Sequence, residues 1–106
     1  MTGGRRRPFE RIGDLIPETA RHLGLEEELR LARAMTTWSA IVAERVPPAA
    51  GATQLLRIDG FSLVVDADHP IVAQELRLRA PELLAAFAAA PGGLPARELR
   101  VSVRRA

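Results

Sequence analysis

Residues 38–76, WSAIVAERVPPAAGATQLLRIDGFSLVVDADHPIVAQEL, decide the fold, because the spacing of their apolar residues changes from helical to strand-like and back to helical. Pro47-Pro48 cannot continue a helix, so the helix at the start of this stretch is predicted to end near Val46. From Gln54 the apolar period is two, and Asp59-Gly60 supplies the residues of a tight hairpin turn. Two antiparallel strands are therefore expected after the double proline.

A third strand is predicted near the end of the chain, where apolar and polar residues alternate most regularly. Helices are expected to cover the apolar face of the resulting sheet. That face is predicted to carry Leu56, Ile58, Leu63, Val65, Leu99, Val101 and Val103. The opposite face, left open, is predicted to carry Arg57, Ser62, Val64, Arg100, Ser102 and Arg104. Arginine side chains are therefore expected to gather on the open face.

The residues before the hairpin have helical spacing. A first helix is predicted over residues 9–23, with Gly24 capping its C-terminus and Pro17 kinking or splitting it. A second and longer helix is predicted over residues 25–46, because strong helix formers fill it and its apolar side chains form one stripe. Trp38 lies on that stripe.

A last helical region follows the hairpin. Pro70 suits its first turn, Pro81 interrupts it, and Pro91-Gly92-Gly93 closes it. The order helix, helix, strand, strand, helix, strand, with a right-handed crossover between parallel strands, predicts an α+β fold. This fold is a two-layer KH-like domain with a three-stranded mixed sheet covered by helices on one face. Residues 9–106 are expected to form this single domain after a basic tail of residues 1–8.

Arginine supplies all the basic charge, with 15 basic residues against 13 acidic ones and a net charge of +2. Residues 1–11 and 97–106 each carry a net charge of +3, whereas the residues between them carry −4. Arginine binds phosphate with a salt-sensitive affinity that does not depend on base sequence, and a solvated surface is the alternative interpretation. The candidate nucleic-acid-binding residues are Arg5, Arg6, Arg7, Arg57, Arg100, Arg104 and Arg105, and the expected ligand is single-stranded DNA, bound weakly.

Catalytic and cofactor chemistry finds no support in the sequence. There is no cysteine, His22 and His69 fall in different predicted elements, and no nucleophile turn or phosphate-binding loop with its lysine occurs. We expect no enzyme activity, no cofactor and no metal. No continuous apolar segment indicates a signal peptide or a membrane span, so a cytoplasmic, nucleoid-associated protein is expected. The chain also lacks a Gly-x-x-Gly loop, so KH-style reading of RNA is not expected.

Several short motifs carry a resemblance to a known family: Gly24-Leu25, Trp38-x-x-Ile41-Val42, Gly60-x-x-Leu63-x-Val65, Ala73-Gln74-Glu75-Leu76 and the alternating last strand. Together they resemble the DciA-type replicative helicase loader family of bacteria. The resemblance implies a KH-like fold and a non-enzymatic accessory protein of DNA replication. It further implies that the protein binds the replicative DNA helicase and assists its loading on single-stranded DNA.

The candidate partner-binding residues are Trp38, Arg77 and Arg79. As the only tryptophan, Trp38 has two interpretations, a core anchor or an interface residue. Two other functions also stay open at this stage. One is a KH-like nucleic-acid-binding module in repair or RNA metabolism, and the other is a structural homodimer in which the open sheet face packs on a second copy.

Overall fold

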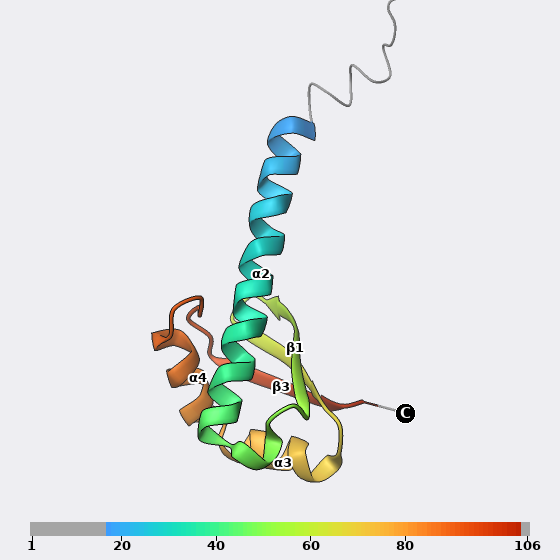
Figure 1. The fold of residues 1–106 in the computed structure, drawn as a ribbon, viewed down its shortest axis with the longest axis vertical. Helices are drawn as coiled ribbons and strands as arrows, with labels where there is room; N and C mark the ends of the chain where they lie inside the picture. The colour runs from blue at the N-terminus through green and yellow to red at the C-terminus, as the bar shows by residue number, and fades with distance from the viewer. Residues whose placement is uncertain (1–16, 105–106) are drawn as a thin grey trace, which may run out of the picture. The chain divides into compact units, whose positions relative to one another are not determined.

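A computed structural model describes the backbone of residues 17–104 and the side chains of residues 24–104. The chain divides into two compact units between Arg30 and Leu31. The described elements are α2 (Pro17–Arg45), the short 3-10 helix η1 (Pro47–Ala49), β1 (Thr53–Asp59), β2 (Ser62–Ala67), α3 (Pro70–Leu78), α4 (Ala80–Ala89) and β3 (Glu98–Val103) (Figure 1). The predicted α+β class and order of elements are confirmed.

Helix α2 runs through Gly24 without a break, so the prediction that Gly24 caps a helix is wrong. One glycine costs a helix only about 1 kcal/mol, and the leucine and glutamate residues that follow Gly24 favour helix strongly enough to continue it. Pro17 stands at the first helical position, where its missing N–H is not needed. The predicted helical residues 9–16 and the predicted tail of residues 1–8 lie outside the described residues. At the other end, the helix stops at Arg45, just before the double proline, as predicted.

The three strands form a sheet in the order β1-β2-β3. β1 pairs with β2 in the antiparallel sense, and β2 pairs with β3 in the parallel sense, as predicted. Gly60 has φ = 63° in the turn between β1 and β2, which only glycine adopts readily. The interruption predicted at Pro81 divides the crossover into the separate helices α3 and α4, and Pro81 lies in the first turn of α4.

A β-bulge between Leu55 and Arg57 changes which residues of β1 face the core. Leu55 pairs with Val65 and is 1% exposed, whereas Leu56 is 41% exposed. The prediction that Leu56 faces the core is therefore wrong, because the extra residue shifts the alternation by one. Past the bulge, Ile58 pairs with Leu63 and packs against the core, as predicted.

The core lies between this sheet and the helices, which cover one face of it (Figure 1). Trp38 is fully buried in it, beside Leu55, Leu63, Leu76 and Phe87. The indole Nε1–H of Trp38 donates to the Thr53 hydroxyl at 3.3 Å, and that hydroxyl donates to the backbone oxygen of Asp66 at 2.5 Å. This burial is what the core interpretation of Trp38 expects.

Candidate nucleic-acid interface

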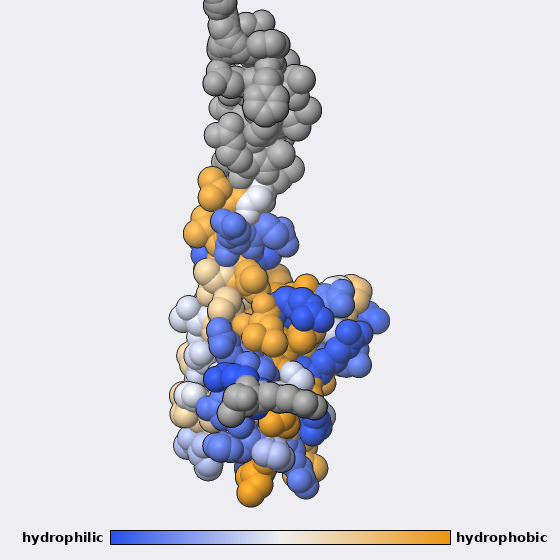
Figure 2. Space-filling view, turned by 90° about the vertical axis from the view of Figure 1, so that its right-hand side faces the viewer, coloured by the Kyte–Doolittle hydropathy of each residue, from blue (hydrophilic) through white to orange (hydrophobic). Residues whose placement is uncertain are grey.

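The open face of the sheet consists of the residues that alternate with the core positions of each strand. In register across the three strands, these residues form rows in which β2 is the central member. The rows are Asp59, Ser62 and Glu98; Arg57, Val64 and Arg100; and Gln54, Asp66 and Ser102. Arg104 follows on the same face after the end of β3. Figure 2 shows that hydrophilic and hydrophobic residues are intermixed on the side of the molecule that lies at the right in Figure 1.

Arg104 is held by two carboxylates. Its guanidinium makes a bidentate contact with Asp66 at 3.0 and 3.1 Å and approaches Asp68 at 3.0 Å. The hydrogen bond to Asp66, followed by the attraction of both carboxylates, raises the pKa of Arg104 above its ordinary value. Asp66 is 8% exposed, so this pairing keeps its charge from being buried alone. A phosphate must therefore compete with these two carboxylates for the guanidinium of Arg104.

Arg100 is also paired, at the other end of the face. Its guanidinium lies 3.4 Å from Glu98 and 3.7 Å from Asp59. The Ser62 hydroxyl donates to Glu98 at 2.7 Å, and this hydrogen bond, followed by the charge of Arg100, lowers the pKa of Glu98. Arg100 thus faces the two carboxylates of the neighbouring row of the sheet.

Arg57 differs from both, because it forms no ion pair within residues 24–104, and its side chain is exposed. The structure therefore places the predicted residues Arg57, Arg100 and Arg104 on one face, as the strand pattern predicts, but four carboxylates accompany them there. The remaining candidates Arg5, Arg6, Arg7 and Arg105 lie outside the described residues.

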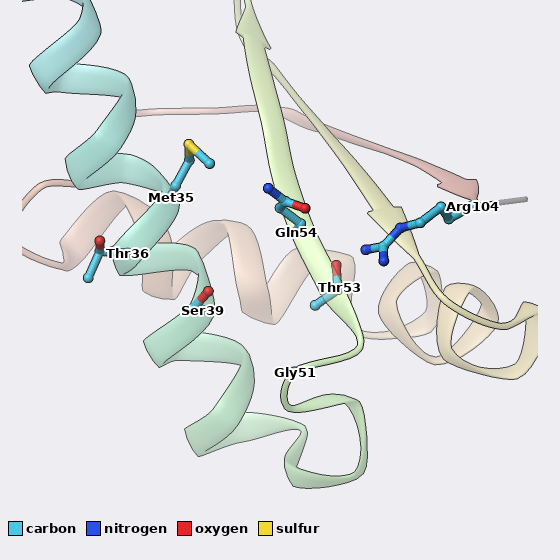
Figure 3. A pocket seen from close by; sticks show the side chains of 7 residues that line it. All are labelled: Met35, Thr36, Ser39, Gly51, Thr53, Gln54 and Arg104. Carbon is cyan, nitrogen blue, oxygen red and sulfur yellow. The ribbon is translucent and has the colours of Figure 1, made fainter. Parts of the chain in front are cut away.

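Beside this face, a pocket of about 440 Å³ opens between α2 and β1 (Figure 3). Met35, Thr36 and Ser39 line it from α2, and Gly51, Thr53, Gln54 and Arg104 line it from the sheet side. The Thr36 hydroxyl donates to the backbone oxygen of Ala32 at 3.2 Å, the Thr53 hydroxyl is engaged with Trp38 and Asp66, and Arg104 is paired. The pocket is thus polar, but most of its polar groups already have partners within the protein.

The predicted partner-binding residues have different surroundings. Trp38 is fully buried, so its side chain offers no surface to a partner. Arg77 is exposed and donates to the backbone oxygen of Val101 at 2.7 Å, which satisfies a carbonyl on the outer edge of β3.

Arg79 joins three elements. It donates to Glu75 at 2.8 Å, lies 3.8 Å from Glu82 of α4, and donates to the backbone oxygen of Arg45 at 3.4 Å, at the end of α2. The hydrogen bond to Glu75 is the main cause of the raised pKa of Arg79. Arg79 therefore links α2, α3 and α4, while its side chain stays partly exposed.

Sequence reasoning missed two exposed apolar residues of α3. Ile71 is 80% exposed and Leu78 is 69% exposed, and the spacing of seven residues places both on the helix face opposite the buried Ala73 and Leu76. A helical projection of α3 that separated Val72 and Leu76 from Ile71 and Leu78 would have indicated them.

Two searches of the described residues complete this inventory. They contain no group of three or more histidine, cysteine, aspartate or glutamate side chains placed to hold a metal ion. None of their helices is long and apolar enough to cross a membrane.

Comparison with known proteins identifies the family. The family model described as "Dna[CI] antecedent, DciA" matches residues 11–101. The chain belongs to the DciA family. The match covers the hairpin, the helices α2, α3 and α4 and most of β3, so the open-face residues except Ser102 and Arg104 lie within the matched range. Membership gives the chain an accessory role in replicative helicase loading, and DciA proteins are not enzymes. Among curated proteins, no sequence matches this chain.

Proposed function

We propose that this DciA protein binds the replicative DNA helicase directly and assists its placement on single-stranded DNA. The observation that carries the proposal is the family match over residues 11–101, which includes α2, α3, α4, β1, β2 and most of β3. The protein acts by contact and by electrostatic attraction of phosphate, without a nucleotide cofactor, in the cytoplasm at the nucleoid. Two surfaces support the two contacts that this role requires.

For the helicase contact, the outer face of α3 offers the most favourable surface. Ile71 and Leu78 expose large aliphatic side chains there, and neither contributes to the core. Arg77 and Arg79 flank them at the end of the helix. The fully buried core of an interface is more apolar than the rest of the surface, and arginine is enriched in interfaces, so this face of α3 fits a protein contact.

For single-stranded DNA, the open sheet face supplies exposed arginines on a rigid scaffold. Arg57 has no carboxylate to release within the described part of the chain, so it contributes more than the paired Arg100 and Arg104. Such contacts give weak affinity that falls as salt rises. Arg5, Arg6, Arg7 and Arg105 are proposed to add to this attraction.

The test is calorimetric titration against the replicative helicase of the same organism at two salt concentrations, with single-stranded DNA alone as the comparison. The variant Ile71→Ser/Leu78→Ser is expected to weaken helicase binding at least tenfold, because each truncated hot-spot side chain costs more than about 1 kcal/mol. The matched control is Leu56→Ser, which removes a 41% exposed leucine from a different face and should leave helicase binding unchanged.

The outcomes separate this function from its alternatives. DNA binding without helicase binding would contradict the loader role and favour a nucleic-acid module in repair or RNA metabolism. A mass that depends on protein concentration, with no salt-sensitive binding, would favour the homodimer.

A further inference from the structure

The turn between β1 and β2 holds an aromatic ring that the core does not use. Phe61 is 58% exposed, although the pattern of β2 places it two residues from the buried Leu63. The guanidinium carbon of Arg97 lies 5.0 Å from the centre of its ring. At this distance, a cation is attracted by the negative face of the aromatic ring.

Backbone hydrogen bonds hold the two residues next to each other. The N–H groups of Arg97 and Glu98 both donate to the carbonyl oxygen of Phe61, at 2.7 and 3.2 Å. The start of β3 is therefore tied to the start of β2, and the backbone positions of Arg97 and Phe61 are set before any ligand arrives. Pre-organisation of this kind lowers the cost of binding.

The charge around this pair favours phosphate. At the hairpin end of the sheet, Arg57 and Arg100 lie on the open face with the carboxylates Asp59 and Glu98, and Arg97 precedes Glu98 and alternates to the other side. Counted over both sides, these groups leave one net positive charge. At the far end, Arg104 alone faces Asp66 and Asp68, which leaves one net negative charge among the residues described there. An anionic ligand is thus drawn to the hairpin end of the sheet, on the side of Arg97.

We propose that Phe61 and Arg97 form a stacking site for one base of single-stranded DNA, with the base on the exposed side of the Phe61 ring and an adjacent phosphate at Arg97. Aromatic rings beside arginines are the elements that bind single strands without reading their sequence. The site rests on the proposed function for its ligand, and it assigns the DNA contact to two residues that the arginine pattern alone does not identify.

The experiment measures binding of a fluorescent oligothymidine by anisotropy over a range of salt concentrations. Phe61→Ala is expected to weaken binding by about 5- to 150-fold, the loss typical of one stacked base. Arg97→Ala should reduce the slope of log affinity against log salt by about 0.7, the value for one phosphate contact on a single strand. Arg97→Lys should keep that slope, and Phe61→Trp should keep the affinity. Val103→Ala, at the far end of the sheet, is the matched control and should bind as the wild type does.

An oligonucleotide with abasic sites separates stacking from general attraction. The wild type should lose affinity for it, whereas Phe61→Ala should bind the abasic and the thymidine strands equally. Equal binding of thymidine strands by Phe61→Ala and the wild type would overturn the site, and so would an equal loss on both kinds of strand.

Helicase titration without DNA keeps this result distinct from the proposed function. Phe61→Ala should give the wild-type helicase isotherm. If this variant instead loses helicase binding and keeps DNA binding, Phe61 belongs to the protein contact and the stacking site is overturned. If the wild type binds DNA through Phe61 but never binds helicase, the stacking site stands and the loader role fails.

Discussion

Replacing Thr53 by valine removes a hydroxyl from the core while keeping the shape of the side chain. In the wild type, this hydroxyl accepts the indole N–H of the fully buried Trp38 at 3.3 Å and donates to the backbone oxygen of Asp66. Valine leaves the indole N–H without a partner in a place that water does not reach. A buried donor left unsatisfied costs about 1–3 kcal/mol. We expect Thr53→Val to lose that much unfolding free energy and to melt about 4–24 °C lower.

Urea denaturation measures the effect. Trp38 is the only tryptophan, so its fluorescence reports directly on the opening of this part of the core. Thr53→Ser is the matched control, because it keeps the hydroxyl and loses only a methyl group. Far-UV circular dichroism follows the variants that lack the tryptophan.

A double-mutant cycle with Trp38→Phe isolates the hydrogen bond. Phenylalanine removes the N–H, so its cost should be smaller by about 1 kcal/mol in the Thr53→Val background than in the wild type. Equal costs in the two backgrounds, or equal stability of the valine and serine variants, would refute the reasoning. Helicase binding by folded Trp38→Phe at the wild-type level would place the role of Trp38 in the core; a selective loss of binding would restore the interface interpretation.

Three further changes test other parts of the structure. Gly24→Ala should stabilise α2 by about 1 kcal/mol, measured as helicity and melting temperature, because Gly24 lies inside the helix; a loss would restore the capping role. Gly93→Ala should reduce the melting temperature strongly, since a Cβ there would overlap the carbonyl oxygen of Phe87, whereas unchanged melting would show that this loop can move aside. Ser62→Ala should raise the pKa of Glu98 toward its ordinary value of 4.5, as measured by NMR titration, because the Ser62 hydrogen bond is the main cause of its lowering. The stabilisation from a lowered carboxyl pKa is full above 4.5 and is lost as pH falls through the folded value, so the stability difference between Ser62→Ala and the wild type should shrink in acid; a constant difference would contradict this.

The hairpin, the crossover and the place of Trp38 follow from local signals that the sequence states directly. The double proline ends α2, the glycine of the turn accepts φ = 63°, and the apolar stripe carries Trp38 into the core. Leu55-Leu56 offers two alternations of equal quality, and only pairing with β2 decides that Leu55 is buried and that the bulge follows it. Local propensity could not decide the role of Gly24, because the same residue suits a cap and is tolerated inside a long helix.

The candidate site shows a similar limit. Alternation along β3 placed Arg100 and Arg104 correctly, but their partners depend on the parallel register that sets Ser62 beside Glu98 and Asp66 beside Ser102. The sequence therefore predicted a face of arginines, but it did not show that Arg100 and Arg104 are paired with carboxylates there. The exposure of the Phe61 ring could not be predicted from alternation, because Phe61 stands two residues from the buried Leu63 and shares its period.

The pairing of the arginines sets how strongly DNA binding should depend on salt. An arginine that is already held by a carboxylate gains less from a phosphate, because it exchanges one ion pair for another. Within the described residues, Arg57 of β1 and Arg97, just before β3, have no carboxylate partner, and two phosphate contacts give a slope of about −1.4 on single-stranded DNA. If Arg5, Arg6, Arg7 and Arg105 also contact phosphate, six contacts give about −4.2. The measured slope, repeated after replacing Arg5, Arg6 and Arg7 by alanine, therefore decides whether the DNA contact is confined to the hairpin end of the sheet or is shared with the basic ends of the chain.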